Sequence, residues 1–106
     1  MSAVLEWAIA HIQTDLSVER LAEHARMSRR TFIRRFRDAT GTTPARWVMQ
    51  QRLAHARALL ESTDWALRRI AHDSGFASDV TLRQNFVAEY TLSPSAYRRQ
   101  FAATDG

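Results

Sequence analysis

The chain has 106 residues, 45% of them hydrophobic, which is enough for one small domain or for two very small units that share an element. It contains no cysteine, which excludes a disulfide framework and a thiolate zinc site, and no apolar run long enough to span a membrane. A net charge of +4, with only three glycines and two prolines, favours an all-α protein with an anionic partner, and we expect it in the cytoplasm.

The first part of the chain has the pattern of a helix-turn-helix. A helical apolar pattern predicts a first helix over about 3–13, and a second, short helix is expected over 17–25. Arg26 and Met27 then form a tight turn, and Ser28 is a good N-cap for a third helix. Two short helices joined by a tight turn, the second of them polar, are typical of this motif.

The third helix combines a buried stripe with a basic face. Phe32, Phe36 and Ala39 recur at i, i+4 and i+7 and predict a narrow apolar stripe. Arg30, Arg34 and Arg37 have the same spacing on another face. Residues 25–47 contain seven arginines and one acidic residue, a local charge of +6 against +4 for the whole chain. Such a helix suits the major groove of DNA.

The chain then restarts and repeats its plan. Thr43 and Pro44 predict the start of a long helix that runs to about Ser62, roughly 18 residues or about 27 Å. Residues 67–76 then resemble residues 18–27 at an offset of 49, and after one inserted residue the offset becomes 50. The pairs at the second offset are Phe32/Leu82, Phe36/Phe86, Thr43/Ser93, Pro44/Pro94 and Trp47/Tyr97.

The repeat predicts an all-α fold of seven helices: two helix-turn-helix subdomains, a homeodomain-like pair, joined by a long linker helix. The expected subdomains cover about 3–43 and 64–101, the linker covers about 44–62, and the last helix ends near Phe101. Successive major grooves on one side of B-DNA lie about 34 Å apart. A linker of about 27 Å can bring two reading helices close to that separation, so a monomer can bind an asymmetric site.

The two reading helices differ in charge and therefore in their expected roles. Arg30 and Arg34 suit guanine, and Ile33 can touch a thymine methyl group. In the second helix Gln84 suits adenine and Asp79 is suited to accept from cytosine, but the helix attracts phosphate only weakly. We predict that the first unit anchors the protein and that the second discriminates or binds weakly.

Other functions are less well supported by the sequence. The alternative is a basic helical protein-interaction module without sequence-specific DNA readout. An RNA-binding domain is disfavoured, because the sequence shows no exposed aromatic pairs for stacking on bases. The four histidines lie on different predicted helices without a second ligand at i+4, so we expect no metal and no cofactor. His72, Asp73 and Ser74 are adjacent on one helix and cannot form a catalytic triad, so we do not expect an enzyme.

The repeat and its phrases resemble the DNA-binding domain of AraC/XylS-type transcriptional regulators over about residues 4–101. The most specific segments are RIAHDSGFASDVTLRQNF, LSPSAYRRQF and the linker-like RLAHARALLE. Within the family, TTPARWVMQQRL and SPSAYRRQF look most like members with an N-terminal DJ-1/PfpI-like domain, which is absent here. The resemblance implies an operator in double-stranded DNA as partner, RNA polymerase as a further candidate, and a missing N-terminal regulatory domain if the chain is a fragment.

The resemblance also assigns positions that read bases. With the arginine face included, the DNA-binding candidates of the first recognition helix are Arg29, Arg30, Ile33, Arg34 and Arg37. Those of the second are Ser78, Asp79, Val80, Thr81, Arg83 and Gln84. Three residues depart from the family pattern: Arg26 stands where a small residue is common, Thr91 replaces a glycine, and Gln84 stands where a basic residue is frequent. The last departure puts tight binding by the second unit in doubt.

Overall fold

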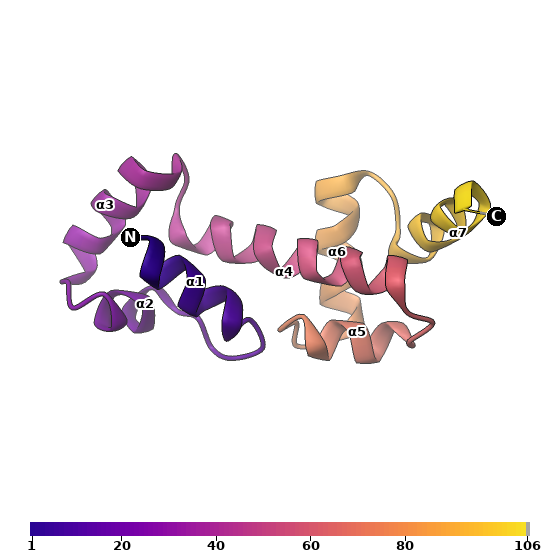
Figure 1. The fold of residues 1–106 in the computed structure, drawn as a ribbon, viewed down its shortest axis with the longest axis horizontal. Helices are drawn as coiled ribbons and strands as arrows, with labels where there is room; N and C mark the ends of the chain where they lie inside the picture. Colours follow the sequence, from indigo (N-terminus) through magenta and orange to yellow (C-terminus); the bar gives the residue numbers. More distant parts are fainter. Residues whose placement is uncertain (106) are drawn as a thin grey trace. The chain divides into compact units, whose positions relative to one another are not determined.

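The computed structural model describes residues 1–105, and the side chains of residues 1–102. Within this part the chain forms seven α-helices and no strand, which confirms the predicted all-α fold (Figure 1). The helices are α1 (Ser2–Ala10), α2 (Val18–His24), α3 (Arg29–Thr40), α4 (Pro44–Ser62), α5 (Leu67–Asp73), α6 (Asp79–Tyr90) and α7 (Pro94–Asp105). No helix among the described residues has the length and apolar character needed to cross a membrane.

The chain divides into two compact units, Met1–Gln51 and Arg52–Gly106, and the boundary falls inside α4. In unit 1 the core lies among α1, α2, α3 and the first turns of α4, around the fully buried rings of Phe32 and Phe36. In unit 2 the corresponding residues Leu82 and Phe86 are also fully buried. Each unit therefore has its own core, built on the apolar stripe of its polar helix.

The internal repeat reappears as equivalent contacts in the two units. Ser28 and Ser78 each N-cap a recognition helix by accepting a hydrogen bond from the backbone N–H three residues on, at 3.2 Å in both units. The ring of Phe36 meets Trp47 edge-on at 5.7 Å between centroids, and Phe86 meets Tyr97 in the same way at 5.8 Å. These aromatic pairs fix the C-terminal part of each recognition helix against the helix that follows.

Each helix-turn-helix turn is a Schellman motif, which places one residue in the left-handed region. In unit 1 Met27 N–H donates to Ala22 O at 3.0 Å across Arg26, whose φ is 59°. In unit 2 the equivalent bond spans Gly75, whose φ is 89°. Arg26 thus occupies a glycine-type conformation with a Cβ in place, a modest strain. The positions after the recognition helices repeat the contrast, with Gly41 at φ 79° and Thr91 at φ 63°.

Thr91→Gly is expected to stabilise the protein by about 0.5–1 kcal/mol. The gain is the left-handed strain of a β-branched residue, about 1–2 kcal/mol, less the entropy that glycine adds to the unfolded chain. Gly41→Ala is the matched control with the opposite sign: its Cβ would meet nothing within 4 Å, so a loss of about 1 kcal/mol would come from φ alone. Urea denaturation of both variants measures the two effects, and a destabilised Thr91→Gly would contradict the assignment of strain.

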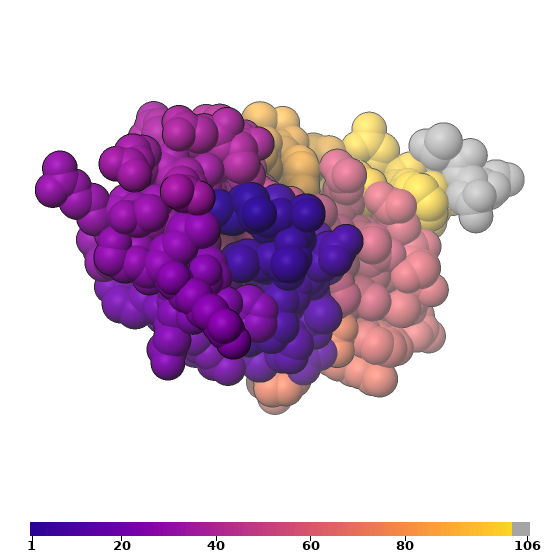
Figure 2. All heavy atoms as spheres, turned by 60° about the vertical axis from the view of Figure 1, so that its left-hand side comes forward, coloured from indigo at the N-terminus to yellow at the C-terminus, as the bar shows by residue number. Residues whose placement is uncertain are grey.

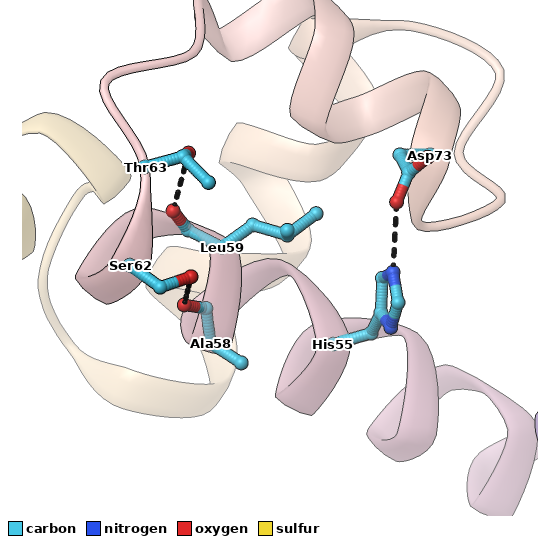
Figure 3. Close-up of polar contacts among 6 residues, drawn as sticks. All are labelled: His55, Ala58, Leu59, Ser62, Thr63 and Asp73. Atoms are coloured by element: carbon cyan, nitrogen blue, oxygen red, sulfur yellow. Dashed lines mark hydrogen bonds and ion pairs between the residues drawn. The ribbon is translucent and has the colours of Figure 1, made fainter.

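Two sets of polar contacts hold α5 and α7 to α4 within unit 2. His55 Nε2 lies 3.0 Å from Asp73 Oδ2, joining α4 to the end of α5 (Figure 3). At the end of α4 the guanidinium of Arg98, on α7, donates to the carbonyl oxygens of Thr63 and Trp65 at 3.3 and 2.9 Å. Arg98 thus supplies hydrogen-bond donors to carbonyl groups just beyond the C-terminus of α4.

Hydroxyl groups bond locally along the same end of α4. Ser62 Oγ donates to Ala58 O at 2.8 Å, and Thr63 Oγ1 donates to Leu59 O at 2.7 Å (Figure 3). Side-chain bonds of this kind slightly destabilise a helix. The helix α4 ends at Ser62, as predicted.

Some details of the predicted elements are wrong. The first helix ends at Ala10 rather than near residue 13. Just beyond its end, Thr14 Oγ1 donates a hydrogen bond to His11 O at 2.8 Å. The last helix continues past Phe101 to Asp105, because alanines follow and neither glycine nor proline interrupts it. Ala39, expected in the buried stripe of the third helix, is exposed. Ala39 lies in the last turn of α3, and Phe36 is the last residue of the buried stripe.

Candidate DNA-binding surface

The first recognition helix, α3, presents a cluster of exposed cations. Burial of Phe32 and Phe36 turns the opposite side of the helix to solvent. We call the exposed arginines on that side, which have no ion pair among the described residues, the arginine face: Arg30, Arg34 and Arg37. Five arginines and one aspartate give α3 a formal charge of +4. Guanidinium groups of this kind can donate in pairs to phosphates or to guanine edges.

Two other predicted residues of α3 are less free to bind a ligand: Arg29 forms an ion pair, and Ile33 is half-buried. Arg29 Nε donates to Glu19 Oε1 at 2.9 Å and so links α3 to α2, with both side chains more than half exposed. Hydrogen bonding to its own backbone N–H, and then to Arg29, lowers the pKa of Glu19. Ile33 is half-buried, so only part of its side chain is available to a ligand.

Unit 1 carries these side chains on an open surface. Figure 2 brings this unit forward, with the indigo atoms of α1 beside the purple atoms of the α2–α3 segment. Several long side chains of that purple segment project into solvent. The exposed guanidinium groups of α3 are suited to a partner that has a groove of its own, as duplex DNA does.

The second recognition helix, α6, carries an ion pair within the helix and no cluster of exposed arginines. Arg83 donates to Asp79 Oδ2 at 3.0 Å, one helical turn away, so two predicted base-reading residues contact each other. Ser78 and the half-buried Thr81 are engaged in the N-cap. One arginine and two acidic residues give α6 a formal charge of −1. Among the predicted residues of α6, Val80 and Gln84 remain exposed and outside these contacts.

Sequence reasoning left three positions out of the predicted site. Val87 lines a shallow hollow on α6 with Val80, Arg83 and Gln84. Arg20 on α2 and Arg69 on α5, equivalent at the offset of 49, each lie over a tryptophan ring, Trp7 at 5.8 Å and Trp65 at 3.5 Å. The equivalence of these two arginines in the repeat was the sequence signal that could have indicated them. In a helix-turn-helix the first helix crosses the phosphate backbone, where such ordered cations are useful.

Among the described residues no group of three or more histidine or acidic side chains could hold a metal ion. Chemically, α3 offers donors for phosphate and guanine, and α6 offers an amide between two valines. Each unit thus presents its own recognition helix, with a charge of +4 on α3 and −1 on α6.

A protein-family model described as a helix-turn-helix domain matches residues 21–100. Among curated relatives, the regulatory protein PocR of Salmonella typhimurium is 34% identical over 94% of this chain and 33% of its own length. The HTH-type transcriptional regulator Rv1931c of Mycobacterium tuberculosis is 40% identical over 77% of this chain and 32% of its own length. The chain therefore spans about a third of the curated relatives that it matches.

Solved structures give the same picture for the fold. The DNA-binding domain of AdpA, solved in complex with a target DNA, has a TM-score of 0.94 and 43% identity, covering 97% of this chain and 93% of that chain. An AraC-type regulator from Chromobacterium violaceum has a TM-score of 0.86 and 28% identity, covering 93% of this chain and 88% of that chain.

Proposed function

This chain belongs to the AraC/XylS family of transcriptional regulators and carries the DNA-binding domain of such a regulator, and we propose that it binds operator DNA by inserting α3 and α6 into successive major-groove segments. The observation that carries the proposal is the arginine face of α3. It stands on the recognition helix of a fold that, in AdpA, was solved with its target DNA. These exposed arginines match the phosphates and guanine edges of the groove.

The two units have unequal roles in this proposal. With a charge of +4, α3 supplies most of the phosphate attraction and anchors the protein. With its ion pair and a charge of −1, α6 adds little attraction and contributes discrimination between sequences. In this proposal Arg20 and Arg69, each held over a tryptophan ring, contact the phosphate backbone of the DNA beside the two recognition helices.

A full-length regulator would add partners to this domain. The curated relatives are about three times as long as the segment they share with this chain. We propose that this larger protein has an N-terminal regulatory domain, contacts RNA polymerase and acts in the cytoplasm.

Selection of bound duplexes from a random library, at about 0.15 M salt to suppress non-specific phosphate binding, tests the proposal. We expect two unlike half-sites about one helical turn apart. A single half-site would leave α6 without a reading role. No enrichment, with equal binding to single-stranded RNA of the same length in competition, would instead favour a basic protein-interaction module.

A further inference from the structure

The exposed face of α6 carries two apolar side chains that packing does not explain. Val80 is 50% exposed and Val87 44% exposed, and they are two of the four large hydrophobic residues that are exposed in the described part of the chain. Positions 80, 83, 84 and 87 follow the i, i+3, i+4, i+7 spacing of one helix face. With Arg83 and Gln84 these valines line the shallow hollow, which we call the α6 hollow.

The charged residues beside the α6 hollow largely cancel each other. The carboxylate of Asp79 and the guanidinium of Arg83 lie 3.0 Å apart in an intrahelical pair. A charge that already has its partner gains less from a new one, because the first contact must be exchanged. The unengaged groups of this face are therefore one amide, that of Gln84, and the two valine side chains.

In the major groove, only A·T base pairs present both an apolar group for the valines and a hydrogen-bonding edge for the glutamine amide. Thymine presents its C5 methyl group, which apolar side chains contact, and adenine presents N6 and N7, which suit the glutamine amide. We propose that the α6 hollow takes thymine methyl groups and that Val87 is a specificity-determining residue together with Val80. This inference rests on the proposed function and adds the base composition of the second half-site: A·T pairs, read by Gln84 and the two valines.

Unit 1 provides the internal contrast. On α3 the single aliphatic candidate, Ile33, is half-buried, and its neighbours Arg30 and Arg34 have no ion pair among the described residues. Guanine is the base that arginine reads best. We therefore expect guanine in the half-site of α3, and in that of α6 thymine on one strand and adenine on the other.

The test replaces single thymines of the selected duplex by deoxyuridine, which differs from thymine only by the absent methyl group. We expect affinity to fall about fourfold at one or more positions of the α6 half-site, the effect of one buried methyl group. Deoxyuridine outside both half-sites is the control and should have no effect. Val80→Ala and Val87→Ala should bind the thymine duplex more weakly and lose the sensitivity to deoxyuridine at their own position.

Ile9→Ala is the matched control variant, because Ile9 is equally exposed, at 52%, but lies on α1. It should keep both the affinity and the sensitivity to deoxyuridine. The valines are exposed, so all three variants should remain folded, which circular dichroism checks.

Several outcomes would overturn the inference. They are an α6 half-site without thymine, deoxyuridine without effect at every position, and valine variants that lose equal affinity for both duplexes. If the valine variants bind DNA normally but fail to activate transcription by purified RNA polymerase, the face docks a protein instead. If the wild-type chain selects no duplex at all, the proposed function fails, and this inference fails with it; wild-type selection without thymine effects refutes this inference alone.

Discussion

Phe86→Ala is expected to lower the free energy of unfolding by about 3–5 kcal/mol, the usual cost of removing a buried phenylalanine ring. Phe86 is fully buried at the centre of unit 2, and its ring contacts Tyr90 and Tyr97 at centroid distances of 4.7 and 5.8 Å. The cavity would remove the contacts that fix α6 against α7. Urea denaturation followed by circular dichroism measures the loss.

Phe101→Ala is the matched control for this core substitution, because it makes the same chemical change at a residue that is 38% exposed. It should cost less than about 1 kcal/mol, as surface substitutions usually do. Native-state hydrogen exchange of Phe86→Ala should show reduced protection in α5 and α6 before α3, since the ring belongs to the core of unit 2. Equal losses for the two variants would mean that Phe86 does not hold this core together.

The repeat explains why so much of the fold was predictable. Pairs such as Phe36/Phe86 and Ser28/Ser78 recur at one offset, and each signal in one unit therefore supports the same reading in the other. The structure shows both pairs in equivalent roles, as buried rings and as N-caps. Local capping chemistry and the helical period agree at these positions, which makes prediction from sequence reliable.

The candidate site was less predictable, because its chemistry depends on which side chains find each other. The i, i+4 spacing of Asp79 and Arg83 permits an ion pair, but spacing alone does not show that the pair forms in preference to separate contacts with bases. The contact between His55 and Asp73 joins residues 18 positions apart, and no periodicity indicates it. The exposure of Ala39 likewise does not follow from the helical period, since this residue lies in the last turn of α3.

Arg34→Ala should weaken binding to the selected duplex by about 1–3 kcal/mol and relax the preference at one base pair. Arg34 is exposed in the middle of the arginine face, one turn after Arg30, where a bidentate contact with guanine O6 and N7 is expected. Titration of the selected duplex and its single-base variants measures both effects. A loss that is equal on every duplex would instead identify Arg34 as a phosphate contact.

Arg34→Lys separates charge from geometry at the same position. Lysine keeps the positive charge but replaces the planar, two-pronged donor by a single ammonium group. If Arg34 reads guanine, Arg34→Lys should recover part of the affinity that Arg34→Ala loses and little of the base preference. The salt dependence of binding supplies an independent readout. Loss of a phosphate contact reduces the magnitude of the negative slope of log K against log salt by about 0.9, whereas loss of a base contact alone does not. Full recovery of both affinity and preference by lysine would show that position 34 needs only a positive charge and not a two-pronged donor.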